Sequence, residues 1–374
     1  MSFFDEISKI DVDKFAPLVE SRTDADVERA LSKDDNLDLN DFAALISEPA
    51  RVHYLKDMAY KSMNLTRKRF GRTVNMYLPL YLTNLCSNRC KYCGFSTANK
   101  FPRTVLTMQE IEEECQAINK LGYENILLVS GENERKAGMP YFREVLPIVK
   151  KYAAFLQMEV QPLSTEDYAE LKTLGLDAVS VYQETYHPGC YKENHLAGKK
   201  MDMRWRMETP DRLGQAGIDK VGVGALLGLY DWKVDVMAVA MHVQYMRRNY
   251  WRTRLSVSFP RLRPAAGGFQ PHTPVNDSKM IQLICAFRIF DHELDLTIST
   301  REAADFRDMI IPLGITAVSA GSSTEPGGYA HKGKYLEQWT VNDDRSVDEV
   351  VAALHKNNLE AVFHDASTTY FRAV

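Results

Sequence analysis

Short apolar runs alternate with longer amphipathic segments along most of the chain. From residue 73 onward there are eight apolar runs of five to nine residues, each followed by a segment with helical spacing: 73–81, 125–130, 156–161, 178–182, 220–226, 254–259, 295–299 and 316–320. Near-continuous apolar strands separated by amphipathic helices are typical of a parallel sheet that is buried on both faces. Eight such units favour an α/β fold with a closed (β/α)8 TIM-type barrel over an open sheet.

The intervening helices have recognisable ends. Thr107 and Ser164 each stand three residues before an acidic residue, the spacing at which a hydroxyl caps the free N–H groups of a helix. Glycines follow the expected helices where a C-terminal stop is needed, at Gly122, Gly175 and Gly217. These ends support the strand and helix assignment.

The chain on either side of the predicted barrel has a different pattern. The first seventy residues are polar and helical in spacing, with short helices expected over 21–28 and 39–45 and a longer basic helix over 54–70. After Gly321 a loop-rich stretch precedes one expected helix, 346–357, and a short strand, 359–364. We therefore expect three parts: an N-terminal helical extension (1–71), the barrel (72–320) and a C-terminal cap without chemistry of its own (321–374).

Composition narrows the class of protein. The chain is 45% hydrophobic with a formal charge of -4, so it lacks the basic excess of nucleic-acid-binding proteins. The N-terminus has an early acidic pair and no signal-peptide pattern, and no apolar run approaches the roughly 20 residues of a membrane span. We expect a cytoplasmic protein with neither nucleic acid nor membrane as a partner.

Three of the six cysteines lie within eight positions, directly after the first predicted strand. Cys86, Cys90 and Cys93 form a CxxxCxxC motif, a clustering unlike a disulfide framework and suggestive of a metal or redox site. Three thiolates on one loop can ligate three irons of a [4Fe-4S] cluster, whereas most such clusters take four cysteines. The fourth iron would keep an open coordination position, as a catalytic zinc does.

The alternatives are a zinc site or chance clustering of structural thiols. A zinc site needs a fourth Cys or His nearby, and the nearest candidate, Cys115, falls well inside an expected helix. Cys285 lies in an apolar helical segment and is most simply a core residue, and we assign no metal role to Cys190. The spacing favours the cluster.

Polar residues gather at or just beyond the C-terminal ends of the predicted strands, where barrel enzymes build their active sites. Ser130, Gly131 and Glu132 end the second strand, Glu159 lies in the third, and Arg301 follows the seventh. A charged residue in or beside a buried strand carries a desolvation cost unless it is paired or used. These positions therefore predict a site at this end of the barrel.

With these motifs the chain resembles the radical S-adenosylmethionine (SAM) superfamily and, within it, the tyrosine lyases of thiamine biosynthesis. The resemblance covers nearly the whole chain and is carried by residues 77–86, 127–132, 158–162, 182–186, 208–212, 258–264 and 296–302. It implies a [4Fe-4S] cluster and SAM as cofactors.

The resemblance also implies that SAM splits to a 5'-deoxyadenosyl radical, which takes a hydrogen from the amino group of L-tyrosine. The Cα–Cβ bond then breaks to give dehydroglycine (2-iminoacetate) and p-cresol. The implied protein partners are a flavodoxin-type electron donor and the thiazole synthase subunit that consumes the imine.

The resemblance also implies roles for single residues around SAM. Glu132, with Gly131 beside it, would receive the amino group of SAM, and Glu159 would accept from the ribose hydroxyls. Arg206 would pair with the SAM carboxylate, although a solvated helix face is the alternative. Tyr92, the aromatic residue before the last cysteine, and Gln183, after the fourth strand, complete the predicted cofactor contacts.

For the amino-acid substrate, Arg301 is the leading carboxylate clamp, because a guanidinium fork matches a carboxylate bidentately. As the resemblance implies, Ser319 and Tyr81 complete this site. Arg301 alternatively pairs with Glu302 or Asp305 in a structural ion pair. The second-choice clamps are Arg261 and Arg263.

The glycine-rich stretch 221–228 has the spacing GxGxxxG and lies on the fifth strand, so it is not a dinucleotide fingerprint. We interpret its small residues as permitting close packing near the cofactor.

Three competing functions remain. The tyrosine lyase of hydrogenase maturation carries a second cysteine cluster in a C-terminal extension, whereas no cysteine follows Cys285 here. A tryptophan-cleaving relative is a second possibility, because the aromatic pocket is not readable from one sequence. A non-catalytic iron-sulfur electron carrier is the third, and it leaves Glu132, Arg206 and Arg301 without a purpose.

Overall fold

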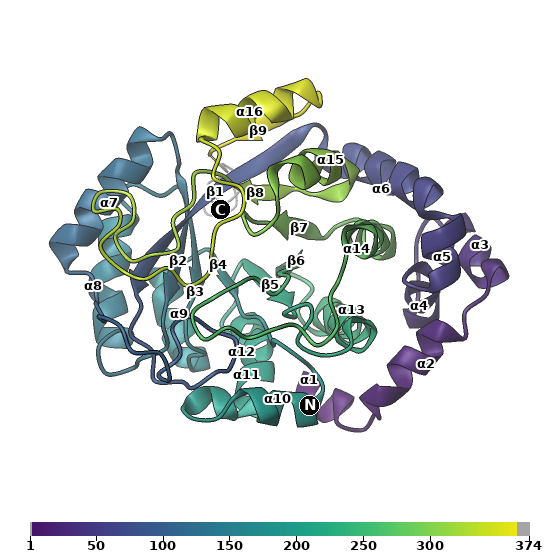
Figure 1. Ribbon diagram of the computed structural model, residues 1–374, viewed down its shortest axis with the longest axis horizontal. Coiled ribbons are helices and arrows are strands. Elements are labelled where there is room, and N and C mark those ends of the chain that lie inside the picture. The colour runs from purple at the N-terminus through teal and green to yellow at the C-terminus, as the bar shows by residue number, and fades with distance from the viewer. Residues whose placement is uncertain (1, 365–374) are drawn as a thin grey trace.

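Eight parallel strands close into a barrel in the computed structural model, which describes residues 2–364 (Figure 1). The strand order is β2-β3-β4-β5-β6-β7-β8-β1, and β1 pairs back with β2 to complete the ring. The strands are β1 (Thr73–Thr83), β2 (Asn125–Ser130), β3 (Phe155–Glu159), β4 (Ala178–Ser180), β5 (Lys220–Gly224), β6 (Arg254–Ser258), β7 (Asp295–Ile298) and β8 (Ala317–Ser319). The predicted fold class is confirmed, with every expected run forming a strand.

The strand ends differ from the prediction in one informative way. β1 runs two residues beyond the expected end, and Thr83 still pairs with Ser130 of β2. β4 and β8 are only three residues long, so Tyr182 and Ala320 lie in the loops that follow them. Apolar composition alone did not separate strand from buried loop at this end of the barrel.

Helices surround the strands, and their ends are those the sequence indicates. The Thr107 hydroxyl accepts from the Glu110 N–H at 3.2 Å, and Ser164 caps its helix in the same way. Gly122 adopts a φ of 88°, a left-handed conformation that suits a helix stop. The outer helices are α7 (Met108–Lys120), α8 (Met139–Val149), α9 (Thr165–Thr173), α12 (Thr209–Gln215), α13 (Trp232–Asn249), α14 (Asp277–Phe290) and α15 (Ala304–Gly314).

Between β4 and α12 the chain makes an extra excursion at the C-terminal end of the strands. It contains α10 (Pro188–Asn194), the 3-10 turn η2 (Lys199–Met201) and α11 (Met203–Met207). This excursion carries Arg206 back toward the barrel.

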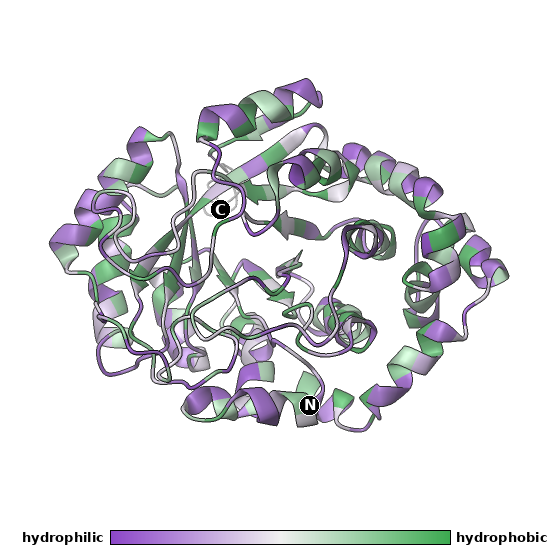
Figure 2. Ribbon diagram, viewed as in Figure 1, coloured by the Kyte–Doolittle hydropathy of each residue, from purple (hydrophilic) through white to green (hydrophobic). Residues whose placement is uncertain are grey.

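The N-terminal extension wraps the outside of the barrel as an arc beside α13, α14 and α15 (Figure 1). Phe42 packs against Phe287 and Phe290 of α14, with ring centroids 4.8 and 4.9 Å apart. α14 is consequently buried on nearly all sides. The strands are mostly hydrophobic, whereas hydrophobic and hydrophilic residues alternate along the outer helices (Figure 2). The helices of the extension are α1 (Phe3–Ile7), α2 (Phe15–Glu20), α3 (Asp24–Ser32), α4 (Leu39–Leu45), α5 (Glu48–His53) and α6 (Leu55–Phe70).

The C-terminal segment adds α16 (Val347–Lys356) and β9 (Glu360–Val362), which pairs in parallel with the start of β1. Before α16 the chain crosses the barrel, where the Tyr329 hydroxyl donates to the Pro79 carbonyl at 2.7 Å. Farther along, Asp343 forms a fully buried ion pair with Arg307 of α15. These contacts hold the segment over the strand ends. No helix in residues 2–364 has the length and apolar character needed to cross a membrane.

A buried carboxyl in α13 predicts a pH dependence of stability. Asp235 accepts from Thr185 and from the Tyr186 N–H through one oxygen, and burial raises its pKa from 3.8 to about 7. As the pH rises, Asp235 loses its proton in the unfolded chain before it does so in the folded protein. The stability that the protonated carboxyl contributes is therefore complete below pH 4 and is lost as the pH approaches 7. The slope is at most about 1.4 kcal/mol per pH unit.

Asp235→Asn removes this one titration. Urea unfolding of wild type and Asp235→Asn between pH 4 and 8 is expected to give curves that diverge, with the variant gaining relative stability as pH rises. Parallel curves would mean that Asp235 ionises normally in the folded protein.

Candidate active site

A cavity at the C-terminal ends of the strands collects most of the predicted site residues. Its lining includes side chains from β1, β3 and β8 and from the loops that follow β1, β2, β6 and β7. Eight of the twelve predicted site residues line it: Tyr81, Tyr92, Cys93, Glu132, Glu159, Arg206, Arg301 and Ser319. The fold therefore brings these distant positions into one site.

The cysteine loop lies directly beside this cavity. Cys86, Cys90 and Cys93 are all free thiols; Cys90 is buried and the other two are half-buried. Cys86 and Cys93 pack against the apolar group formed by Tyr81, Leu127 and Val129, among others. Burial raises the pKa of Cys86 to about 11 and also raises the pKa of the other two thiols.

The three thiols suit a cluster better than a single ion. Within residues 2–364, no group of three or more His, Cys, Asp or Glu side chains converges as a site for one metal ion. The irons of a cubane are spread apart, so its ligands need not meet at a point. Cys115 and Cys285 are buried in α7 and α14, as expected for core residues.

Gly131 permits the end of β2 to approach the cysteine loop. A Cβ atom at this position would lie 2.5 Å from the Leu85 carbonyl oxygen and 3.3 Å from the Cys86 Cβ. Any side chain would therefore push the loop away. The glycines of β5 act similarly, since a Cβ on Gly222 would lie 2.2 Å from the Ser180 hydroxyl oxygen. Their predicted role in close packing is confirmed.

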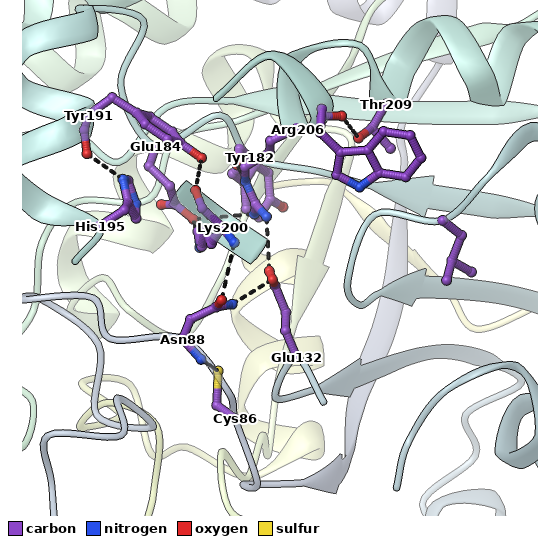
Figure 3. Close-up of polar contacts among 12 residues, drawn as sticks. Cys86, Asn88, Glu132, Tyr182, Glu184, Tyr191, His195, Lys200, Arg206 and Thr209 are labelled. Carbon is purple, nitrogen blue, oxygen red and sulfur yellow. Dashed lines mark hydrogen bonds and ion pairs between the residues drawn. The ribbon is translucent and has the colours of Figure 1, made fainter. Parts of the chain in front are cut away.

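Glu132 lies at the centre of a charged network next to this loop (Figure 3). One carboxylate oxygen pairs with Arg206 at 2.9 Å, and the other accepts from the Asn88 side-chain amide at 2.6 Å. Lys200 pairs with Glu184 at 2.7 Å, and Arg206 reaches Glu184 at 3.5 Å. The side chains of Arg206, Lys200, Glu132 and Glu184 thus form one largely buried network of two cations and two carboxylates.

The structure excludes the alternative of a solvated helix face for Arg206. Its side chain is only 7% exposed, and its Nε donates to the Tyr182 carbonyl at 2.8 Å. Burial lowers the pKa of Arg206, but the carboxylates of Glu132 and Glu184 outweigh it and hold the pKa above its usual value. The guanidinium is fixed in place before any ligand binds.

Replacing Arg206 with glutamine is expected to lower the free energy of unfolding by about 3–5 kcal/mol, because Glu132 loses its cationic partner and Glu184 is left with Lys200 alone. Urea unfolding measures this loss. Arg143→Gln is the matched control, since Arg143 forms an exposed pair with Glu170 and its removal should barely change stability. Equal effects of the two substitutions would contradict the buried-network interpretation.

Arg301 is a cation without an ion pair among the described residues. It lines the cavity, and its guanidinium carbon lies 4.1 Å from the centre of the Trp339 ring. The alternative pairing with Glu302 is wrong, because Glu302 turns away and accepts from Arg261 Nε at 2.9 Å. Burial lowers the pKa of Arg301, while acidic groups of the same cavity, among them Tyr81 and Glu159, partly oppose this shift.

The second-choice arginines differ from each other. Arg261 forms ion pairs with Glu302 and with Asp277, the second at 2.7 Å. It is therefore not free to clamp a ligand. Arg263 lines the cavity, and its Nε is buried without a partner in the described part of the chain. Of the three candidate clamps, Arg301 and Arg263 are thus the two that line the cavity without an ion pair in the described residues.

Three further predicted residues line the same cavity as Arg301. Burial raises the pKa of Glu159 to about 7, while the positive charge of Arg301 opposes this shift. The Tyr81 hydroxyl donates to Gln338 at 2.8 Å. The Ser319 hydroxyl oxygen is buried and has no hydrogen-bond partner in the described residues, so it is available to a ligand.

Sequence reasoning missed several lining residues. The C-terminal segment contributes Ser322, Gln338 and Trp339 to the cavity, so the cap takes part in the site, contrary to expectation. Lys200 and Glu184 also line the cavity and were not predicted. Gln183, which was predicted, is buried and lines neither this cavity nor the second cavity beside Asn88 and Glu132. Glu184 has a φ of 71°, rare for a residue other than glycine and a sign of backbone strain at a functional site.

Comparison with known proteins adds independent evidence. The family model described as Radical SAM superfamily matches residues 80–239, and the Biotin and Thiamin Synthesis associated domain matches residues 258–360. The 2-iminoacetate synthases of Salmonella typhimurium and Escherichia coli are each 50% identical over 373 residues, covering all of this chain and 98% of theirs.

Solved structures agree on the fold. A crystal structure of HydG, a maturase of the [FeFe]-hydrogenase, superposes with a TM-score of 0.88 at 27% identity, covering 95% of this chain and 80% of that one. Methylornithine synthase (PylB) has a TM-score of 0.69 at 20% identity, covering 90% of this chain and 97% of that one, and supports the fold alone.

Proposed function

The chain belongs to the 2-iminoacetate synthases of the radical SAM superfamily, and we propose that it cleaves the Cα–Cβ bond of L-tyrosine to 2-iminoacetate and p-cresol. The observation that carries this proposal is the free guanidinium of Arg301 in the same cavity as Cys93. Arg301 is half-buried, and a cation withdrawn from water without an ion pair is costly unless an anionic ligand completes it. The carboxylate of an amino acid meets that requirement.

We assign the cofactor residues as follows. Cys86, Cys90 and Cys93 would hold a [4Fe-4S] cluster through their three thiolates, which leaves one iron without a protein ligand for SAM. Glu132 receives the amino group of SAM, supported by its position between the cysteine loop and Arg206. When bound, the cluster and SAM supply the radical that starts the reaction.

Three more residues complete the SAM site in this proposal. Arg206 orients the SAM carboxylate, Glu159 accepts from the ribose hydroxyls, and Tyr92 lines the cavity next to Cys93. Gln183 receives no contact, since it lies outside the cavity lining. Glu184 fixes Lys200 and Arg206 from the same loop.

The chain itself contributes binding, orientation and exclusion of water. Arg301 binds the tyrosine carboxylate as a fork, and Ser319 of β8 and Tyr81 of β1 orient the substrate from the neighbouring strands. Trp339 stacks on Arg301 and limits the access of water to the pair. The raised pKa of Glu159 lets this carboxyl hold a proton near neutral pH.

Two protein partners follow from the chemistry. The cluster needs a low-potential electron, which a flavodoxin-type protein supplies. The imine product reacts readily with water, so a thiazole synthase subunit that consumes it directly is the second partner. Both remain part of the proposal.

A panel of amino acids tests the substrate. Anaerobic enzyme with a reconstituted cluster, dithionite and SAM is given L-tyrosine, L-tryptophan or L-phenylalanine, and the products are measured by mass spectrometry. We expect p-cresol, together with glyoxylate from hydrolysis of 2-iminoacetate, from L-tyrosine alone. Cleavage of L-tryptophan in its place would support the tryptophan-lyase alternative, and cyanide from tyrosine would support the hydrogenase-maturation type.

A further inference from the structure

The cysteine loop does not stand alone at the surface but pairs with the segment that follows α10. Cys90 and His195 form an antiparallel bridge. Around it, the Arg89 N–H donates to the Ala197 carbonyl at 3.0 Å, and the Leu196 N–H donates to the Arg89 carbonyl at 2.9 Å. The two segments thus behave as a short two-stranded ribbon over the cluster site.

Side chains alternate across this ribbon, as the geometry of extended chains requires. Cys90 and His195 point inward and are buried, whereas Arg89, Lys91 and Leu196 point outward and are exposed. His195 accepts or donates a 2.8 Å hydrogen bond with the Tyr92 hydroxyl, which fixes the loop from inside. The exposed residues Arg89 and Lys91 are therefore the immediate neighbours in sequence of Cys90, a proposed iron ligand.

The outer side of the ribbon is basic. It carries Arg89, Lys91, Lys192 and Lys199, with Glu193 as its acidic residue, whereas Lys200 turns inward to Glu184 and the whole chain has a formal charge of -4. Lys91 pairs with Glu193 at 3.0 Å and Lys199 pairs with Glu134 at 2.5 Å, but neither Arg89 nor Lys192 forms an ion pair within the described residues. Leu196 is 46% exposed among these charges. We call Arg89, Lys91, Lys192, Leu196 and Lys199 the basic face.

We propose that the basic face is the docking surface for an acidic, one-electron carrier protein that reduces the cluster. This inference rests on the proposed function, which requires a reduced cluster. The carrier loses one electron and the cluster gains it, so no bond is made or broken. Basic residues steer an acidic partner and fix its orientation, and Leu196 offers an apolar contact at the centre.

The position of the face favours a carrier over another kind of partner. SAM and tyrosine occupy the cavity inside the barrel, so electrons must arrive from outside. At the Cys90–His195 bridge, the buried Cys90 lies between the exposed residues Arg89 and Lys91. A carrier docked there reaches the cluster without entering the cavity.

Charge reversal tests this proposal. The double variant Arg89→Glu/Lys91→Glu is compared with Lys120→Glu/Lys356→Glu, which makes the same change at the exposed ends of α7 and α16. The probe is reduced flavodoxin, an acidic flavoprotein, and the readout is the rate of cluster reduction followed by absorbance in a stopped-flow instrument. Cluster reduction is measured without tyrosine, so the result does not depend on the proposed lyase activity.

We expect the Arg89→Glu/Lys91→Glu variant to need at least about tenfold more flavodoxin for the same rate, because two attractive charges become repulsive. Its iron content and its reduction by dithionite should match wild type. In wild type, added salt should slow reduction by flavodoxin but not by dithionite. Equal flavodoxin dependence in wild type and both variants would overturn the proposal, as would a rate in wild type that salt does not change.

Discussion

Replacing Cys90 with serine lowers the formation of 5'-deoxyadenosine from SAM by at least about a thousandfold, because the cofactor carries the difficult chemistry. Cys90 is the buried member of the three thiols beside the cavity. A serine hydroxyl has nearly the same size but is a hard, weakly acidic ligand that holds iron-sulfur clusters poorly. Iron and acid-labile sulfide content, measured with the SAM cleavage rate, should fall together.

Cys285→Ala is the matched control for this prediction. Cys285 is also a fully buried free thiol, but it packs inside α14 and is outside the cavity lining. The control should keep its iron and its SAM cleavage while losing some stability to the missing sulfur atom. A Cys90→Ser protein with a full iron content, or an equal loss in the control, would contradict the assignment of the cluster ligands.

Replacing Arg301 with glutamine is expected to lower kcat/KM for L-tyrosine by about 10- to 150-fold, since a charge-assisted hydrogen bond contributes about 1.5–3 kcal/mol. The loss should fall on tyrosine more than on the cofactors, because Arg301 forms no ion pair in the described chain and its guanidinium instead stacks on the Trp339 ring. Tyrosine titration of p-cresol formation measures the effect. Cluster content and the slow cleavage of SAM without tyrosine should remain.

Arg301→Lys separates charge from geometry. Lysine keeps the positive charge but not the bidentate fork, so it should recover only part of the loss. Arg143→Gln on the outer surface should leave the tyrosine dependence unchanged. If Arg301→Gln retained the tyrosine dependence of wild type, Arg263 would become the candidate clamp, because it also faces the cavity.

Much of the fold was readable from the sequence because buried parallel strands have a strong pattern. Every predicted run became a strand, and the cap residues Thr107 and Ser164 act as expected. The main site residues were also found, since charges such as Glu132 and Arg301 stand at strand ends, where topology alone brings them together. For these residues, position along the chain determines position in the barrel.

The remaining residues depend on side-chain direction or on distant loops, which a strand pattern does not specify. Glu302 stands beside Arg301 in sequence, yet it pairs with Arg261 from the preceding loop. In the loop after β4, Glu184, which has a left-handed φ, lines the cavity, whereas its neighbour Gln183 does not. Gln338 reaches the cavity from a loop more than 250 positions after Tyr81, its hydrogen-bond partner. No local signal marks such a contact.

The central claim is that SAM cleavage at this cluster is coupled to the breaking of tyrosine. Its most direct test is an anaerobic time course of the reconstituted, reduced wild-type protein with SAM, with and without L-tyrosine, in which 5'-deoxyadenosine and p-cresol are both quantified. The account predicts that tyrosine accelerates formation of 5'-deoxyadenosine and that p-cresol accumulates in a near-equal amount. Cleavage of SAM that is indifferent to tyrosine, with no p-cresol formed by cluster-loaded protein, would contradict it.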